Sequence, residues 1–342
     1  MKRARRLSLI GIGPIGASII KLAHNRKYQW IGAVDIDPQK RGKDLGQVAG
    51  LKRKLGVQVE SSLERVLQQK PDLVIHSTVS SLEKAYPQIM ECVHAGVDVI
   101  STTEELAYPY QRHNELAKRL DQQAKKNNVT VLGTGVNPGF LMDLLPLTLT
   151  GPCWEVRHLL VERRIDADLR RGPFQHKIGA GLSVVEFNQT ISVGGGHVGL
   201  LESLYMVAAG LGITIDHIEE SIEPMIAAAP FNGRLIAVDK GKVLGLRQSA
   251  QGYSNGHEII SLSFAAFLGL ENPADRIVLD GEPTIEMVIP GGIPGDPATA
   301  AMAVNSIANV LAASAGLVTM KDLPVPRAMG SWADTEVGPY EI

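Results

Sequence analysis

The segment Gly11-Ile12-Gly13-Pro14-Ile15-Gly16 (GIGPIG) decides the fold of this 342-residue chain. It follows an apolar run at residues 7–10 and opens a segment with helical periodicity. The first glycine permits a tight turn, the second lets the backbone approach a pyrophosphate, and the third lets helix and strand pack closely. An acidic residue, Asp35, ends the next apolar run. The six-residue segment therefore predicts a βαβ unit that binds a dinucleotide, with phosphates at the helix N-terminus.

The residues after the second predicted strand bear on the choice of dinucleotide. Asp35 is expected to accept hydrogen bonds from the adenosine ribose hydroxyls, which favours NAD. Lys40 and Arg41 follow it and suit the additional phosphate of NADP, although a solvated helix start explains them equally well. The sequence predicts NAD or NADP as cofactor and leaves the preference open.

Short apolar runs alternate with helical patterns up to about residue 135. The predicted strands are residues 7–10, 30–34, 58–59, 73–75, 97–100 and 129–132. Alternation of this kind predicts an α/β fold with a doubly wound, mostly parallel sheet of the Rossmann type. We expect this domain to occupy residues 1–140.

After Gly151 the pattern changes to long alternating runs at residues 156–162, 259–267 and 284–289, with one apolar helix at 197–211. This pattern predicts a second, α+β domain over residues 141–295 with a largely antiparallel sheet. Asp296 and Pro297 suit the N-cap and first position of a helix that continues through residues 298–315. We expect residues 296–327 to pack back on the first domain and residues 328–342 to form a variable tail.

Composition excludes several classes of protein. The formal net charge is −2 and the basic residues are spread out, so nucleic acid is not an expected partner. The basic run at residues 2–6 imitates a secretory signal, but glycines and Pro14 interrupt the apolar stretch after it. No apolar run reaches the roughly 18 residues that span a membrane. Cys92 and Cys153 have neither metal-ligand nor disulfide-framework spacing, which predicts no metal, a buried Cys92 thiol and a cytoplasmic location.

Polar residues gather where the predicted strands end, which is where ligands bind in open α/β sheets. Hydroxyls, glycines and an amide at several strand ends suit contact with ribose and nicotinamide. The expected cofactor contacts beyond the glycine loop and Asp35 are Lys40, His76, Ser77, Thr78, Thr102 and Asn137.

Two adjacent carboxylates, Glu104 and Glu105, follow the fifth predicted strand. One explanation is that both occupy the first turn of a helix, where the helix dipole favours negative charge. The other is that a carboxylate faces the nicotinamide, where it binds a substrate ammonium, takes its proton and later activates water. We expect Glu104 to be this catalytic base and Glu105 to lie at the substrate.

Five segments carry a resemblance to a known family. They are 101–106 (STTEEL), 135–140 (GVNPGF), 174–181 (FQHKIGAG), 197–203 (HVGLLES) and 295–305 (GDPATAAMAVN). On these segments the chain resembles the 2,4-diaminopentanoate dehydrogenases and native amine dehydrogenases, relatives of dihydrodipicolinate reductase, up to about Arg327. The resemblance implies oxidative deamination of 2,4-diaminopentanoate or a simple alkyl amine by NAD(P)⁺, reversible as reductive amination. It also implies a homodimer. The catalytic glutamate of the family falls on the Glu104-Glu105 pair, and the resemblance assigns it to Glu104.

The chain departs from neighbouring families and, at one point, from this one. Ile293 stands near Gly295 where relatives often have histidine. Homoserine dehydrogenases are similar but place a lysine where this chain has Glu104, and dihydrodipicolinate reductases have a His-His pair that His176-Lys177 only echoes. The alternatives are therefore an NAD(P)H-dependent reductase of another carbonyl or imine, or a non-catalytic NAD(P)H sensor. Glu104 argues against both, and no DNA- or partner-binding segment is apparent.

Candidate substrate residues in the second domain are less specific. Arg163 and Lys177, taken as strand residues, suit a substrate carboxylate, although isolated basic residues in strands more often lie on the surface. His197 suits either a pocket or a helix cap, and Phe140 is expected to wall the pocket. The alternating strands leave one sheet face to cover, which predicts a homodimer through this domain.

Overall fold

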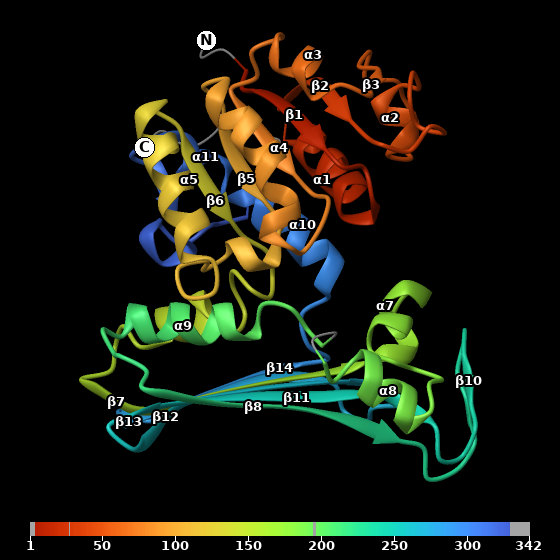
Figure 1. The fold of residues 1–342 in the computed structure, drawn as a ribbon, viewed down its shortest axis with the longest axis vertical. Coiled ribbons are helices and arrows are strands. Elements are labelled where there is room, and N and C mark those ends of the chain that lie inside the picture. The colour runs from red at the N-terminus through yellow and green to blue at the C-terminus, as the bar shows by residue number, and fades with distance from the viewer. Residues whose placement is uncertain (1–3, 27, 194–195, 329–342) are drawn as a thin grey trace.

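Two β-sheets, one above the other in Figure 1, organise the chain. The structure is a computed structural model and describes residues 4–26, 28–193 and 196–328. The N-terminal part of the chain forms the upper sheet and its helices, and the chain then builds the lower sheet. The C-terminal part of the described chain returns to the upper sheet (Figure 1).

The first sheet is parallel throughout, with strand order β15-β6-β5-β4-β1-β2-β3. All six predicted strands are present within about one residue of their expected ends. The strands are β1 (Arg6–Ile10), β2 (Gln29–Val34), β3 (Val59–Glu60), β4 (Leu73–His76), β5 (Asp98–Ser101), β6 (Thr130–Gly133) and β15 (Gly316–Val318). The edge strand β15 was not predicted, because three residues carry too little periodicity to identify a strand.

The strand order reverses between β1 and β4, which places the expected ligand crevice at their carboxyl ends. Buried apolar residues pack against both faces of the sheet. The helices of this region are α1 (Pro14–Asn25), α2 (Leu45–Val48), α3 (Leu63–Leu67), α4 (Leu82–His94), α5 (Asn114–Lys126), α6 (Leu144–Leu149) and the 3₁₀ turn η1 (Glu104–Leu106). Cys92 of α4 is buried as expected, and burial raises the pKa of its thiol to about 12.

The second sheet has the order β14-β13-β7-β12-β11-β8, and only the β12–β7 pair is parallel. The predicted α+β class with a largely antiparallel sheet is therefore confirmed. The strands are β7 (Glu155–Asp166), β8 (His217–Ile226), β11 (Val243–Ser254), β12 (His257–Phe267), β13 (Ala274–Glu282) and β14 (Ile285–Pro290), beside a small hairpin of β9 (Phe231–Asn232) and β10 (Ala237–Val238).

Four short segments of this domain lie over the sheet or beside its end (Figure 1). They are η2 (Ala167–Leu169), α7 (Gly172–Lys177), α8 (Val184–Thr190) and α9 (Leu200–Gly210). Lys177 ends helix α7, so its expected place in a strand is wrong. The apolar helix begins at Leu200 rather than at residue 197, because Gly199 has a positive φ of 107° that interrupts the helix.

The C-terminal helical segment differs from the prediction in two details. Helix α10 (Gly295–Asn305) is capped by Pro294, so Asp296 lies inside the first turn and is not the N-cap. The helix stops at Ser306 and α11 (Ile307–Ala312) follows, with η3 (Met320–Asp322) after β15. Helix α10 packs against α1 and contributes Met302 and Val304 to the core of the first sheet.

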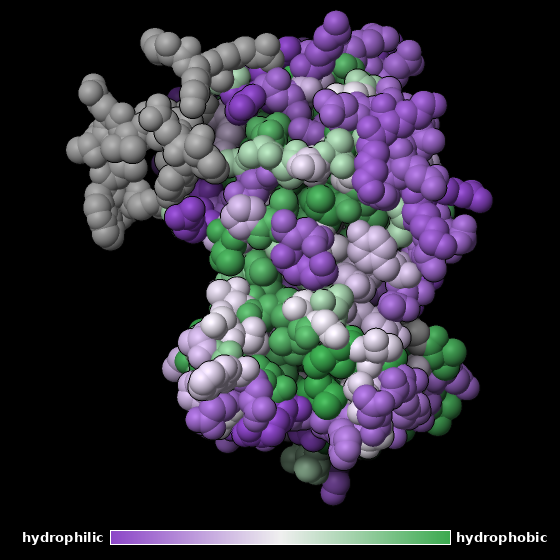
Figure 2. All heavy atoms as spheres, turned by 90° about the vertical axis from the view of Figure 1, so that its left-hand side faces the viewer, coloured by the Kyte–Doolittle hydropathy of each residue, from purple (hydrophilic) through white to green (hydrophobic). Residues whose placement is uncertain are grey.

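On the face shown in Figure 2, hydrophobic side chains gather at the middle of the molecule, between two mainly hydrophilic ends. Helices α5 and α9 lie on this side (Figure 1). Within the described ranges, no helix is both long enough and apolar enough to cross a membrane. The expected tail at residues 328–342 lies almost wholly outside the described residues.

Candidate active site

The three glycines of the loop have different structural roles. Gly11 has φ of +87°, and a Cβ there would lie 2.3 Å from the carbonyl oxygen of Ser77. A Cβ on Gly16 would lie 2.3 Å from the carbonyl oxygen of Gly11. By contrast, a Cβ on Gly13 would have no atom within 4 Å, and no side chain caps the helix that follows. Gly11 and Gly16 therefore build the turn, whereas Gly13 faces open space beside free N–H groups, which fits a pyrophosphate.

Asp35 at the end of β2 is held in place by the same loop. Its Oδ2 accepts hydrogen bonds from the amide of Ile12 at 2.7 Å and from Nζ of Lys40 at 3.1 Å. Although burial alone would raise its pKa, hydrogen bonds from Asp37, Ile12 and Lys40 lower the pKa of Asp35 below its usual range. The Lys40 charge is thus already paired with a carboxylate, while Arg41 donates to the carbonyl oxygen of Ile36.

The strand-end hydroxyls form a small network around His76. This ring is fully buried, with Nδ1 2.9 Å from Oγ of Ser101 and Nε2 2.9 Å from Oγ1 of Thr78. Burial lowers the pKa of His76 to about 4, so the ring is neutral. Thr102 donates to the Ser77 hydroxyl at 3.3 Å. His76 is therefore a buried support for the loop that follows β4, whereas Thr78 is exposed on the surface of that loop.

The two adjacent glutamates have different surroundings. Oε2 of Glu105 accepts the amide of Leu82 at 2.7 Å and lies 3.0 Å from Nε2 of His113. This carboxylate therefore joins η1 to the N-terminus of α4. Glu104 is half-buried, and its carboxylate has no hydrogen bond or ion pair to any described residue. Of the two, Glu104 is the one free to bind and deprotonate a substrate.

Asn137 and His197, predicted separately, meet between the domains. The amide Nδ2 of Asn137 donates to Nε2 of His197 at 2.9 Å. The imidazole stacks on Phe264, with ring centroids 4.5 Å apart and planes 20° apart. Desolvation, with smaller contributions from Lys177 and Arg163, lowers the pKa of His197 to about 3.

A buried carboxylate that the sequence did not single out fixes the loop carrying Asn137. Asp143 Oδ2 accepts the amide of Gly139 at 2.7 Å and the hydroxyl of Ser203 at 2.8 Å. Gly199 packs so closely on Pro138 that a Cβ would lie 2.3 Å from the Pro138 ring. The loop after β6 is therefore fastened to helix α9 of the second domain.

One row of residues crosses the second sheet beneath His197. Strand register pairs Asp275 with Arg163, Arg163 with Phe264, Phe264 with Gln248, and Gln248 with Ile222. Residues paired across neighbouring strands share a sheet face, so the row lies on one face. Gln248 accepts the backbone amide of His197 at 2.7 Å, which identifies this as the face toward the first domain.

Arg163 is buried in this row, so the alternative that placed it on the surface is wrong. Its Nη2 donates to the carbonyl oxygen of Ile293 at 2.7 Å and its Nε lies 3.9 Å from Asp275. Its Nη1 is buried and has no partner in the described chain. A buried guanidinium with an unused donor suits an anionic group of a ligand.

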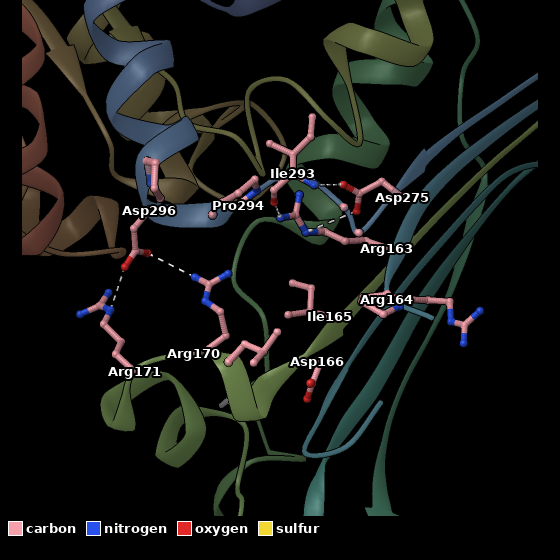
Figure 3. Close-up of a pocket in the computed structure, with 16 residues that line it drawn as sticks. Arg163, Arg164, Ile165, Asp166, Arg170, Arg171, Asp275, Ile293, Pro294 and Asp296 are labelled. Atoms are coloured by element: carbon pink, nitrogen blue, oxygen red, sulfur yellow. Dashed lines mark hydrogen bonds and ion pairs between the residues drawn. The ribbon is translucent and has the colours of Figure 1, made fainter. Parts of the chain in front are cut away.

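A pocket of about 380 Å³ lies at Arg163, between β7 and the start of α10. Figure 3 shows Arg170 and Arg171 both reaching Asp296, at distances of 3.4 Å and 2.9 Å. The other predicted substrate residues lie apart from it. Lys177 is exposed at the end of α7, and Phe140 is half-buried against the core of the first sheet.

A second pocket, of about 390 Å³, is lined by His197. Both domains line it, with Glu105 and Arg112 from the first and His197, Glu202 and Glu220 from the second. Glu202 was missed because its segment reads as an apolar helix. The signal was present nonetheless, since a carboxylate among the buried residues of such a helix is rare without a partner or a function. No group of three potential metal ligands occurs among the described residues.

Comparison with known proteins supports the resemblance seen in the sequence. Residues 140–337 match the model of the 2,4-diaminopentanoate dehydrogenase C-terminal domain. The chain is 35% identical over 328 residues to 2,4-diaminopentanoate dehydrogenase of Acetoanaerobium sticklandii, covering 89% of this chain and 93% of the relative. It is 23% identical to an amine dehydrogenase of Streptomyces virginiae, covering 94% of this chain and 96% of the relative.

A solved structure agrees with these relatives. The amine dehydrogenase from Mycobacterium smegmatis is 26% identical, with a TM-score of 0.85, and the match covers 96% of this chain and 98% of that one. The biliverdin reductase of Synechocystis shares the fold alone. It is 14% identical, with a TM-score of 0.52, and the match covers 83% of this chain and 79% of that one. With a family model over more than half its length and a 35% identical relative along most of it, the chain belongs to the 2,4-diaminopentanoate dehydrogenase family.

Proposed function

We propose that this protein oxidises a primary amine to a ketone and ammonia with NAD(P)⁺, and catalyses reductive amination in reverse. The observation that carries the proposal is Glu104, a partly buried carboxylate without a partner among the described residues, at the carboxyl end of β5. A lysine would suit a hydroxy substrate there, whereas a carboxylate suits an ammonium. The relatives named amine dehydrogenases support the same reaction class.

The chemistry assigned to this chain's own residues starts with an amine entering between the domains. Glu104 takes a proton from its ammonium group, which leaves a neutral amine with a lone pair. NAD(P)⁺ supplies the hydride acceptor for the carbon that bears this amine, so an iminium is formed. Glu104, once it has passed its proton to solvent, takes a proton from water as that water attacks the iminium carbon. Glu104 then returns that proton to the amino nitrogen, the carbon–nitrogen bond breaks as the hydroxyl loses its proton to solvent, and a ketone and ammonia leave.

Neutral groups around the amine preserve its attraction to Glu104. His197 has a pKa of about 3 and so adds no positive charge at neutral pH. Asn137 holds the ring in place through Nε2. The loop after β6 and the loop before α9 bound the site from both domains, which limits the access of bulk solvent while the hydride is transferred.

The substrate we propose is an amine that also bears a carboxylate, as 2,4-diaminopentanoate does. The unused Nη1 of Arg163 is the group that would bind it, and Lys177 adds positive charge at longer range. A simple alkyl amine would leave this buried donor without a partner, at a cost of about 1–3 kcal/mol. The alternative, a simple alkyl amine, predicts equal rates with and without the carboxylate.

We propose one role for each successive region of the chain. Residues 1–140 bind NAD(P), residues 141–295 bind substrate and a second subunit, residues 296–327 pack back on the first domain, and residues 328–342 form a tail. The apolar region in Figure 2 and the 90% exposed Trp154 support a homodimer, which light scattering would report as twice the chain mass of 36.8 kDa. The free thiols of Cys92 and Cys153 support a cytoplasmic location.

The test is a panel of amines with NAD⁺ and with NADP⁺, followed by absorbance of the reduced nicotinamide. We expect turnover, ammonia release in equal amount, and preference for amines that carry a carboxylate. Arg163→Met should remove that preference, whereas Arg247→Met should not, because Arg247 is exposed on the opposite face of the sheet and lines neither pocket. Reduction of ketones with no requirement for ammonium would instead support a carbonyl reductase.

A further inference from the structure

The second pocket, bounded by Glu105, Glu202, Glu220 and His197, contains more negative than positive charge. Its three carboxylates share the pocket lining with one cation, Arg112, which is 47% exposed and reaches only Oε1 of Glu202, at 3.4 Å. His113, outside the lining, lies 3.0 Å from Glu105, so Glu202 and Glu220 carry the excess negative charge. A pocket between two domains with this imbalance attracts cations rather than anions.

Glu202 is the unusual member of this group. Its side chain is only 1% exposed, and its Oε2 is buried with no partner in the described residues. Burial raises the pKa of Glu202, Arg112 lowers it, and nearby Glu105 raises it further. A carboxylate oxygen that is buried without a hydrogen-bond partner destabilises the folded protein. A bound ligand that donates a hydrogen bond to this oxygen would remove that cost.

A second unpaired acceptor lies beside the same pocket. Oδ1 of Asn137 is buried without a partner, while Nδ2 of the same amide binds His197, which lines the pocket. Oε1 of Glu220 already accepts from Gln248 at 2.9 Å, so it contributes charge rather than an unused buried acceptor. Both unused atoms are acceptors, so a ligand that donates hydrogen bonds suits them and one that only accepts does not.

We infer that this pocket is a binding site for a primary ammonium group, with Glu202 as its main ligand, distinct from the amine that reacts at Glu104. The inference rests on the proposed function, because that function supplies two sources of such a group. One source is the ammonium ion that is released in deamination and consumed in the reverse reaction. The other is a second amino group on the substrate.

The experiment compares Glu202→Gln with wild type in the direction of reductive amination. With NADH and ketone saturating, we expect the KM for ammonium to rise at least tenfold while kcat falls less than threefold. Glu223→Gln is the matched control, because it removes the same charge from exposed strand β8 at a residue that does not line the pocket. It should leave the KM for ammonium unchanged.

A second arm identifies the source of the ammonium group. If the pocket holds a second amino group, Glu202→Gln lowers kcat/KM for a diamine at least tenfold but not for the matching monoamine, and the KM for ammonium stays constant. Glu220→Gln, at an exposed position where folding is not at risk, should change the affected constant in the same direction by a factor of about two or three. If Glu202→Gln, correctly folded, changes neither constant, the inference is wrong.

Binding without turnover separates this inference from the proposed function. Ammonium chloride should raise the melting temperature of wild type above that in tetramethylammonium chloride of equal ionic strength, because tetramethylammonium has no N–H donor. Glu202→Gln should lose this difference and Glu223→Gln should keep it. A protein that shows this pattern but deaminates no amine retains the site and lacks the proposed activity. Equal melting temperatures in the two salts for wild type would overturn the inference.

Discussion

The side-chain amide of Asn137 donates a hydrogen bond of 2.9 Å to Nε2 of His197, so a residue of the first domain sets the tautomer of a residue of the second. With Nε2 as acceptor, the proton of the neutral ring is on Nδ1. The contact joins the loop after β6 to the loop before α9. His197 therefore contributes a fixed, uncharged ring to the site.

The two neutral histidines make stability depend on pH. The pKa values of His76 and His197 are lowered to about 4 and about 3, below the ordinary value of 6.5. Below pH 6.5 the unfolded chain binds protons that the folded chain does not, so this stability is complete above pH 6.5 and is lost as pH falls toward 4. For His76 the expected loss between pH 7 and pH 5 is about 2 kcal/mol.

Urea unfolding of wild type and His76→Gln at pH 7 and pH 5 measures this contribution. The variant should lose about 2 kcal/mol less than wild type between the two pH values. Equal losses in the two proteins would show that His76 is protonated in the folded state at pH 5.

The contrast between Glu104 and Glu105 tests the assignment of the base. Glu104→Gln keeps the size of the side chain but cannot take a proton, so kcat should fall roughly 10²–10⁴-fold while NADH binding persists. Glu105→Gln should change kcat less than about tenfold, or ~1.4 kcal/mol of barrier. It should lower the melting temperature instead, because the Glu105 carboxylate accepts the backbone amide of Leu82 and contacts the imidazole ring of His113. Loss of turnover in Glu105→Gln alone would move the base by one residue, and activity in both would remove the carboxylate mechanism.

The glycine loop gives a test of cofactor binding without a change of fold. In Gly13→Val the new side chain enters open space, so the protein should fold normally. Its affinity for NADH, measured by nicotinamide fluorescence, should fall at least tenfold, which is about 1.4 kcal/mol of binding free energy. Gly16→Ala should instead lower the melting temperature, because its Cβ would lie 2.3 Å from the Gly11 carbonyl oxygen. Unchanged NADH affinity in Gly13→Val would exclude this loop as the pyrophosphate site.

Asp35 is predicted to control the choice between NAD and NADP. A carboxylate repels the 2′-phosphate of NADP, and it also occupies Lys40. Asp35→Ser removes the repulsion and frees Lys40, so the ratio of kcat/KM for NADP over NAD should rise at least tenfold, or about 1.4 kcal/mol. Taking the ratio cancels any loss of active protein, and Lys40→Met on the Asp35→Ser background should reverse the gain. A ratio that does not change would mean that the adenosine ribose lies away from Asp35.

Sequence patterns predicted those features that depend on neighbouring residues. The glycine loop, the six strands of the first sheet and the second sheet's class all follow from local periodicity and turn chemistry. Strand β15 was missed because it is three residues long and is stabilised by pairing with distant β6. The helix start after Gly199 was missed because its positive φ accompanies close packing on Pro138, and the start after Pro294 was missed because Asp296 and Pro297 also suit a helix start.

The candidate site shows the same division between local and long-range information. Glu104, Asn137, Arg163 and His197 could be selected by residue type and position, but nothing local indicated that Asn137 and His197 touch. Glu202 and Asp143 were missed because each is significant only through what surrounds it in space. Lys177 was placed on a strand because a six-residue helix leaves almost no periodic signal.

The return of α10, α11 and β15 to the first sheet has a consequence for synthesis on the ribosome. One face of that sheet buries Met302, Ile307 and Val310. Strands β1 to β6 emerge first, yet the part of this face that α10 and α11 cover stays exposed to water until residues 295–318 leave the ribosome, after the entire second sheet has been made. At translation rates of about 5–20 residues per second, the nascent chain carries this uncovered apolar surface for roughly ten to forty seconds. The last step in folding of the N-terminal domain thus comes late in synthesis, and a chaperone has that interval in which to bind the uncovered surface.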